Sequence, residues 1–179
     1  MKQKFKTDIE AIRIRARQHM EHGAVTHAYQ ADREQVLRVL NEIVCILRYR
    51  NHYHMAVGTK GKAAAAEFLE HAQQEEQHAD WVAHRITQLG GKPNFSPVGI
   101  ETRAHAEYVE GDTLRQMVEE DLVAERIAIE TYSEVVRWLG DDDPTTRVLV
   151  ERILEQEEEH ADDMMNLLED IGRAEDPVR

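Results

Sequence analysis

Apolar residues recur at every third or fourth position along most of the chain, which is the spacing of an amphipathic helix. The expected helices cover about residues 32–57, 62–89, 113–139 and 144–171. Gly58 and Gly61 end the first of these helices, and Gly140 ends the third. Asp143 and Pro144 supply the cap and the first-turn proline that begin the last helix. The pattern therefore predicts an all-α protein.

The lengths of the connections predict how these helices are arranged. Only a few residues join the first helix to the second and the third to the fourth, so each pair should form an antiparallel hairpin. Roughly twenty residues connect the hairpins, which is enough to cross the length of a bundle. Within this connection we expect a short helix over residues 100–109. We expect a four-helix bundle over residues 31–179, two antiparallel hairpins joined by a long crossover, after an N-terminal extension over residues 1–30.

Each expected helix carries a glutamate in the middle of its apolar stripe. These acids are Glu42, Glu75, Glu125 and Glu157. A carboxylate buried alone in an apolar core is costly and stays protonated. The nearly equal spacing of the acids within the two expected hairpins indicates that they reach one level of the bundle. Carboxylates that meet inside a bundle in this way are suited to binding cations.

A short phrase occurs twice and supplies histidines to the same level. It reads EEQHAD from Glu75 and EEEHAD from Glu157. Positions three apart share one face of a helix, so each copy can direct its glutamate and its histidine to one point. Four carboxylates balance the charge of two divalent cations, and carboxylate with imidazole suits iron or manganese. The candidate metal ligands are Glu42, Glu75, His78, Glu125, Glu157 and His160.

With this ligand set the chain resembles the ferritin-like superfamily, and within it bacterioferritin and the Dps-like di-iron ferritins. The resemblance runs from about residue 41 to residue 171. It rests on Asn41-Glu42 with Tyr49, Glu75-x-x-His78-Ala79-Asp80, Gly91-Lys92-Pro93-Asn94, Glu125 and Glu157-x-x-His160. It implies that Glu75 and Glu157 bridge two metal ions and that Tyr49 lies beside them. It also assigns the remaining ligands in pairs, one pair to each ion: Glu42 with His78, and Glu125 with His160.

The resemblance also implies a function. Proteins of this kind are ferroxidases that oxidise Fe(II) with dioxygen or hydrogen peroxide at an intra-bundle di-iron site, for iron storage or detoxification. Each subunit would bind two iron ions, with manganese as an alternative, and would assemble into a homo-oligomer. Glu76 stands where bacterioferritin has its haem-ligating methionine, so haem is not expected. The chain ends shortly after Gly172, without the short fifth helix of larger cages, which favours twelve subunits over twenty-four.

Composition narrows the range of partners. The net charge of −13 disfavours nucleic acid and anionic membranes as partners of the whole surface. No run approaches the about 20 apolar residues of a membrane span, and no signal-peptide pattern is present, so a cytoplasmic protein is expected. The single cysteine, Cys45, excludes an internal disulfide and a four-thiolate metal site. Histidines such as His52 and His54 are expected at the surface.

Other functions stay open on the residues alone. A di-iron or di-manganese peroxidase or catalase-type oxidoreductase would use the same ligands. Residues 1–17 are rich in lysine and arginine, so a DNA-protecting mini-ferritin with a basic arm is another alternative. A metal-free structural bundle is the last.

Overall fold

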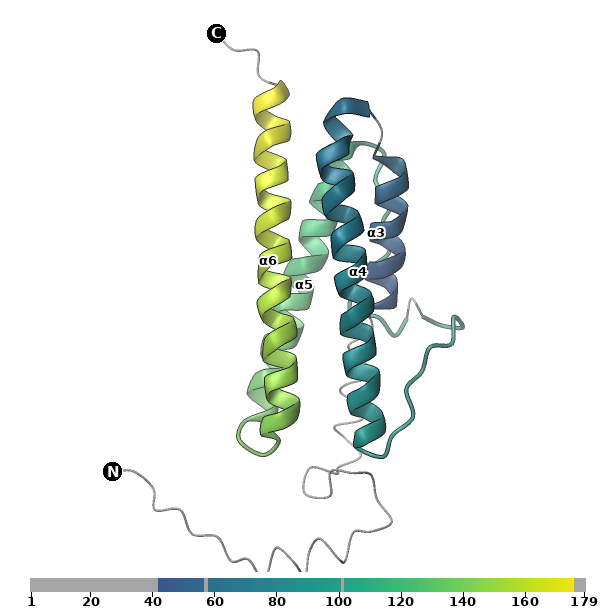
Figure 1. Cartoon of the computed structure of the whole chain (residues 1–179), viewed down its shortest axis with the longest axis vertical. Helices are drawn as coiled ribbons and strands as arrows, with labels where there is room; N and C mark the ends of the chain where they lie inside the picture. Colours follow the sequence, from purple (N-terminus) through teal and green to yellow (C-terminus); the bar gives the residue numbers. More distant parts are fainter. Residues whose placement is uncertain (1–41, 57, 101, 176–179) are drawn as a thin grey trace, which may run out of the picture.

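The computed structural model describes residues 42–56, 58–100 and 102–175, and this part of the chain contains helices and no strands. The helices lie side by side as an elongated bundle (Figure 1). They are α3 (Ile43–Met55), α4 (Gly58–Gln88), α5 (Leu114–Leu139) and α6 (Pro144–Glu175). The expected all-α bundle is therefore confirmed. The expected start of the first helix, near residue 32, and the basic arm over residues 1–17 lie outside the described residues.

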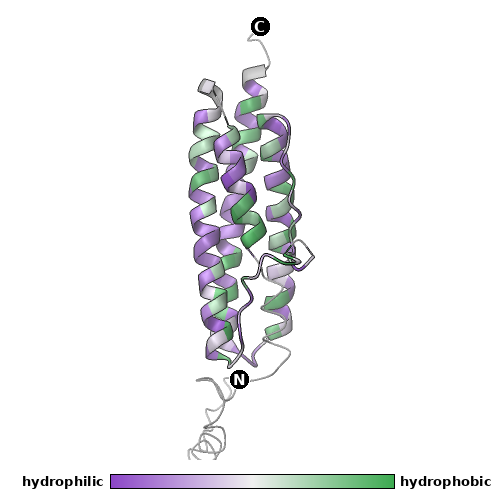
Figure 2. Ribbon diagram, turned by 90° about the vertical axis from the view of Figure 1, so that its right-hand side faces the viewer, coloured by the Kyte–Doolittle hydropathy of each residue, from purple (hydrophilic) through white to green (hydrophobic). Residues whose placement is uncertain are grey.

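The helices pair as two antiparallel hairpins, α3 with α4 and α5 with α6, and α4 also packs against α6. A long crossover leaves the end of α4 and runs along the bundle to the start of α5 at the opposite end (Figure 2). The topology expected from the connection lengths is thus confirmed. None of the helices within the described residues is both long enough and apolar enough to cross a membrane.

Two local expectations were wrong. Gly61 does not end a helix: α4 already begins at Gly58, and a Cβ atom at Gly61 would lie 3.0 Å from the carbonyl carbon of Ala56. The glycine therefore allows the tight approach of the first hairpin turn. The short helix expected over residues 100–109 is also absent, because residues 102–109 form only turns, bends and irregular backbone. Side chains from α3 hold this segment instead.

The two larger apolar clusters of the core are separated by a polar layer. One cluster includes Val82, Ile86, Leu89, Tyr132, Val135, Leu139, Val150 and Ile153. The other includes Tyr49, Phe68, Ala72, Met117, Val118, Leu122 and Met164. Along α4, α5 and α6 the glutamates singled out by the sequence fall between these clusters. The amphipathic stripes therefore place the acids near the middle of the bundle.

Capping fixes where the second hairpin's helices begin. Thr113 accepts a hydrogen bond from the backbone N–H of Gln116 at the start of α5. Asp143 accepts one from the backbone N–H of Thr146 at 3.1 Å, which confirms the expected cap of α6. The guanidinium of Arg85, near the end of α4, pairs with the Asp143 carboxylate at 3.1 Å. This cap therefore also ties the two hairpins together.

Candidate metal centre

The candidate ligands converge inside the bundle. All are buried, with at most 2% of each residue exposed: Glu42, Glu75, His78, Glu125, Glu157 and His160. Ligand atoms of Glu75, Glu125, Glu157 and His160 lie within 4.8 Å of one another. The residues that meet in this group come from α4, α5 and α6, and Glu42 stands at the N-cap position of α3, where its side chain makes no capping hydrogen bond. Every helix of the bundle thus contributes a carboxylate.

Each imidazole contacts the glutamates of both hairpins. Nδ1 of His78 lies 3.4 Å from Glu75 on its own helix and 3.1 Å from Glu157 on α6. Nδ1 of His160 lies 3.5 Å from Glu157 on its own helix and 3.5 Å from Glu75 on α4. The two copies of the repeated phrase therefore face each other, with Glu75 and Glu157 between the two rings. This is the arrangement that carboxylates shared by two cations require.

Two glutamines orient these rings, and the sequence analysis missed them. The outer nitrogen of His160 is 2.6 Å from Oε1 of Gln74, and that of His78 is 3.0 Å from Oε1 of Gln156. In each pair the ring nitrogen donates to the amide oxygen, so in the neutral ring Nδ1 is the nitrogen without a proton and can bind a cation. The signal was present, because Gln74 and Gln156 each precede the glutamate that opens the repeated phrase.

Tyr49 lies beside the centre, where the sequence analysis expected it. Its buried hydroxyl donates a short hydrogen bond to Oε1 of Glu125 and lies 3.3 Å from Nδ1 of His71. The ring of His71 stacks on that of His160 with 4.0 Å between the ring centres. A chain of polar contacts therefore links Tyr49 to two candidate ligands.

Close packing of acids and imidazoles shifts their pKa values in both directions. Burial, with repulsion from neighbouring carboxylates, raises the pKa of Glu42 well above its usual range and that of Glu157 to about 8. Burial also disfavours ionisation of Glu75 and Glu125, but the nearby imidazoles outweigh it and lower both pKa values. Burial disfavours the charged form of His78 too, yet Glu157 and Glu75 raise its pKa to about 10. Protons thus occupy part of the centre, in positions that cations could take.

Several buried polar atoms of the candidate metal centre lack hydrogen bonds, which bears on whether cations fit there. Within the described residues, no well-aligned hydrogen bond reaches either carboxylate oxygen of Glu42, Glu75 or Glu157, or Nδ1 of His78 and His160. Buried polar groups are normally hydrogen-bonded, so a cluster of exceptions calls for an explanation. Oxygen and nitrogen donors that point toward one another, with more carboxylates than imidazoles, fit hard divalent cations.

His52 is not the surface group that the sequence analysis expected, whereas His54 is exposed. His52 is fully buried, and its Nδ1 lies 2.8 Å from Oδ2 of Asp121. Nε of Arg48 donates to the other oxygen of Asp121 at 2.7 Å. This buried triad, Arg48–Asp121–His52, is part of the framework around the centre and joins α3 to α5.

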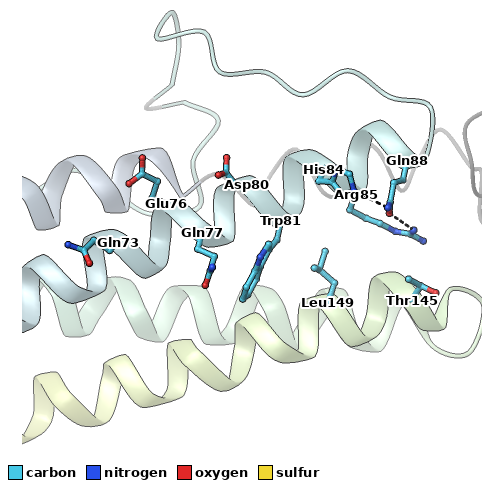
Figure 3. Close-up of a pocket in the computed structure, with 10 residues that line it drawn as sticks. All are labelled: Gln73, Glu76, Gln77, Asp80, Trp81, His84, Arg85, Gln88, Thr145 and Leu149. Atoms are coloured by element: carbon cyan, nitrogen blue, oxygen red, sulfur yellow. Dashed lines mark hydrogen bonds between the residues drawn. The ribbon is translucent and has the colours of Figure 1, made fainter.

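A shallow groove of about 580 Å³ lies on the surface between α4 and α6, apart from the buried ligands (Figure 3). Gln77 and Trp81 extend from α4 toward α6, while Glu76 lies at the rim. The guanidinium of Arg152 covers the Trp81 ring at 4.1 Å from its centre. Glu76, at the position discussed for haem, lies 3.7 Å from the exposed Arg50.

Comparison with known proteins agrees with this architecture. The model of the ferritin-like domain matches residues 38–174. Bacterioferritin from Mycobacterium bovis is 32% identical over 140 residues, which cover 75% of this chain and 84% of the relative. A dodecameric thioferritin, the bacterioferritin-related protein of Bacteroides fragilis, has a TM-score of 0.74 at 29% identity and covers 79% of this chain and 86% of its own.

The crystal structure of BfrA from Mycobacterium tuberculosis has a TM-score of 0.70 at 27% identity and covers 80% of this chain and 87% of its own. The family match spans the described bundle and all the candidate ligands. The chain belongs to the ferritin-like family.

Proposed function

We propose that this protein stores or detoxifies iron and is a ferroxidase that oxidises Fe(II) at a two-metal centre inside the bundle. The observation that carries the proposal is the buried meeting of Glu75, Glu157, His78 and His160, whose inward atoms form no well-aligned hydrogen bond within the described residues. The similarity to bacterioferritins supports iron as the metal. The N and O donors would also accept manganese.

The ligand roles follow from position. Glu75 and Glu157 lie between the two imidazoles and would be shared by both cations. Glu42 and His78 would complete the binding of one cation, and Glu125 and His160 that of the other. Tyr49 would hold Glu125 in place through its hydroxyl. The outer glutamines would keep each imidazole turned toward its cation.

The reaction is a two-electron exchange. Two Fe(II) ions give up one electron each, and these electrons with two protons reduce dioxygen to hydrogen peroxide or hydrogen peroxide to two water molecules. The protein's part is to hold both ions in one water-poor site and to balance their charge with carboxylates. Protons that cations displace from His78 and Glu157 would be released as iron binds.

We further propose that the chain assembles into a homo-oligomer, with twelve subunits favoured. A dodecameric relative covers 79% of this chain with the same fold. An assembly of this kind would enclose the oxidised iron.

Anaerobic Fe(II) titration followed by exposure to oxygen tests the function. We expect oxidation to be rapid up to two irons per chain and uptake to continue beyond two if iron is stored. Saturation at two without further uptake would instead favour a peroxidase or catalase-type oxidoreductase. Replacing His78 or Glu157 with alanine should abolish the rapid phase, whereas Glu158→Gln, at an exposed neighbour, should preserve it. Full-rate oxidation by His78→Ala would contradict the proposed site.

A further inference from the structure

We propose that His105, in the crossover, is an additional metal-binding residue that supplies a second imidazole, besides His78, to the cation at Glu42. This inference rests on the proposed two-metal centre. The imidazole side chain of His105 is only 3% exposed, and its Nε2 lies 3.6 Å from Oε2 of Glu42. Ligand atoms of Glu42, His105 and Cys45 lie within 4.8 Å of one another. A histidine from an irregular segment thus reaches a carboxylate of the centre.

Hydrogen bonds hold the crossover in place just after His105 along the chain. Nη1 of Arg48 donates to the carbonyl oxygen of Glu107 at 2.9 Å, and Nε2 of His52 lies 3.2 Å from that of Val109. The Asp121 carboxylate holds both α3 side chains. A buried charge network is expensive to build and is expected where position matters. Here the network holds the backbone two and four residues beyond His105.

The residue next to His105 is anchored by packing. Ala106 is 2% exposed and lies in a small cluster with Cys45 on α3 and Ala124 on α5. Cys45 follows Glu42 by one helical turn, and Ala124 directly precedes Glu125. The crossover therefore inserts between the two helices that carry the ligands outside the repeated phrase. With Ala106 and Glu107 both held, the His105 side chain has little freedom to leave the interior.

The two halves of the bundle differ at this position in a way that favours a ligand role. Glu42 and Glu125 are each followed by a tyrosine seven residues later, Tyr49 and Tyr132. Tyr49 donates to Glu125, the glutamate of the other half. By the same symmetry Tyr132 should donate to Glu42, yet its hydroxyl has no hydrogen-bond partner within the described residues.

His105 lies beside both residues of this missing contact. Its ring is edge-on to Tyr132 with 6.0 Å between the ring centres, and it faces the Glu42 carboxylate. The carboxylate oxygens of Glu42 receive no well-aligned hydrogen bond from the described residues. An imidazole nitrogen is a good ligand for a divalent transition metal, and an interior one beside a carboxylate completes a binding site. The two cations would therefore have different ligand sets, with the extra nitrogen on the Glu42 side.

Anaerobic titration of the full chain with Co²⁺, followed by calorimetry and visible absorption, tests the inference without using oxidation. The wild-type protein should bind two Co²⁺ per chain, and His105→Ala should weaken one of them at least tenfold while leaving the other unchanged. His54→Ala, which removes an exposed imidazole from α3, is the matched control and should keep both affinities. Unchanged affinities in His105→Ala would overturn the role of His105 but not the two-metal centre. Absence of Co²⁺ binding by the wild type would overturn both.

A crystal of the wild-type protein grown with Co²⁺ provides a second measurement that does not depend on how the variant folds. An anomalous peak about 2.1 Å from a His105 ring nitrogen would support the assignment, since that is the length of a zinc–imidazole bond. A peak bound by Glu42 and His78 that lies beyond bonding reach of His105 would overturn it.

Discussion

The outer nitrogen of each candidate ligand histidine lies against a glutamine from the other hairpin. An amide oxygen can only accept, so it fixes the ring's tautomer and direction without adding negative charge to a centre already rich in carboxylates. We expect Gln156→Ala to weaken metal binding about 10–100-fold while the fold persists. Calorimetric titration with Zn²⁺ measures this, and Gln73→Ala, an exposed glutamine, is the control. Equal affinities in both variants would show that Gln156 does not orient His78.

At the scale of single residues, the raised pKa of His78 also predicts that metal binding releases protons. The pKa of His78, raised from 6.5 to about 10 by Glu157 and Glu75, means that its charged pair stabilises the metal-free fold fully below about pH 6.5. That stabilisation is lost as the pH rises through about 10. A cation needs the neutral ring, so metal affinity should increase with pH up to about 10.

Zn²⁺ titration at pH 7 in two buffers with different ionisation enthalpies measures the released protons. The difference in binding heat between the buffers should correspond to the release of at least one proton per chain. His54→Ala, at an exposed histidine, should not alter this difference. Heats that do not depend on the buffer would contradict protonation of the metal-free centre.

At the scale of elements, the Arg48–Asp121–His52 triad connects α3, α5 and the crossover. Asp121→Ala would leave the Arg48 guanidinium, which is 1% exposed, without its carboxylate. We expect a loss of about 3–5 kcal/mol in the free energy of unfolding, because a buried charge would lose its counter-charge. Denaturant unfolding followed by circular dichroism measures it, with Asp142→Ala on the exposed turn as control. A decrease of less than about 1 kcal/mol in the free energy of unfolding would mean that Asp121 does not stabilise the fold by pairing with Arg48 and His52.

The same scale shows what the sequence could and could not predict. Long helices follow from apolar periodicity, and the candidate ligands follow because buried glutamates interrupt that periodicity at matched places. His105 could not be found in this way, because the conformation of the crossover depends on Arg48 and His52, which are distant in sequence. Gly61 was misread because a glycine inside a helix can serve a close contact rather than end the helix.

At the scale of the whole molecule, α3 presents large apolar side chains to solvent. Leu47 is 51% exposed and Met55 is 54% exposed. Because exposed apolar groups can mark contacts between subunits, we infer that Leu47 and Met55 lie in such a contact. We expect Leu47→Glu to reduce the mass of the native oligomer, as measured by analytical ultracentrifugation, because a charge would be buried at the contact. Met165→Glu, at a 41% exposed residue of α6, is the comparison. An unchanged mass in Leu47→Glu would place the contact elsewhere.

The polar layer between the two larger apolar clusters also affects the stability and degradation of a subunit that has no bound metal. A bundle whose midsection holds facing carboxylates is weakest there until cations arrive, so its folding equilibrium responds to the supply of metal. Each tenfold rise in free metal above the dissociation constant adds about 1.4 kcal/mol of stability per site. Empty chains would therefore open more often and be degraded sooner than loaded ones. Metal scarcity would in this way lower the abundance of the protein.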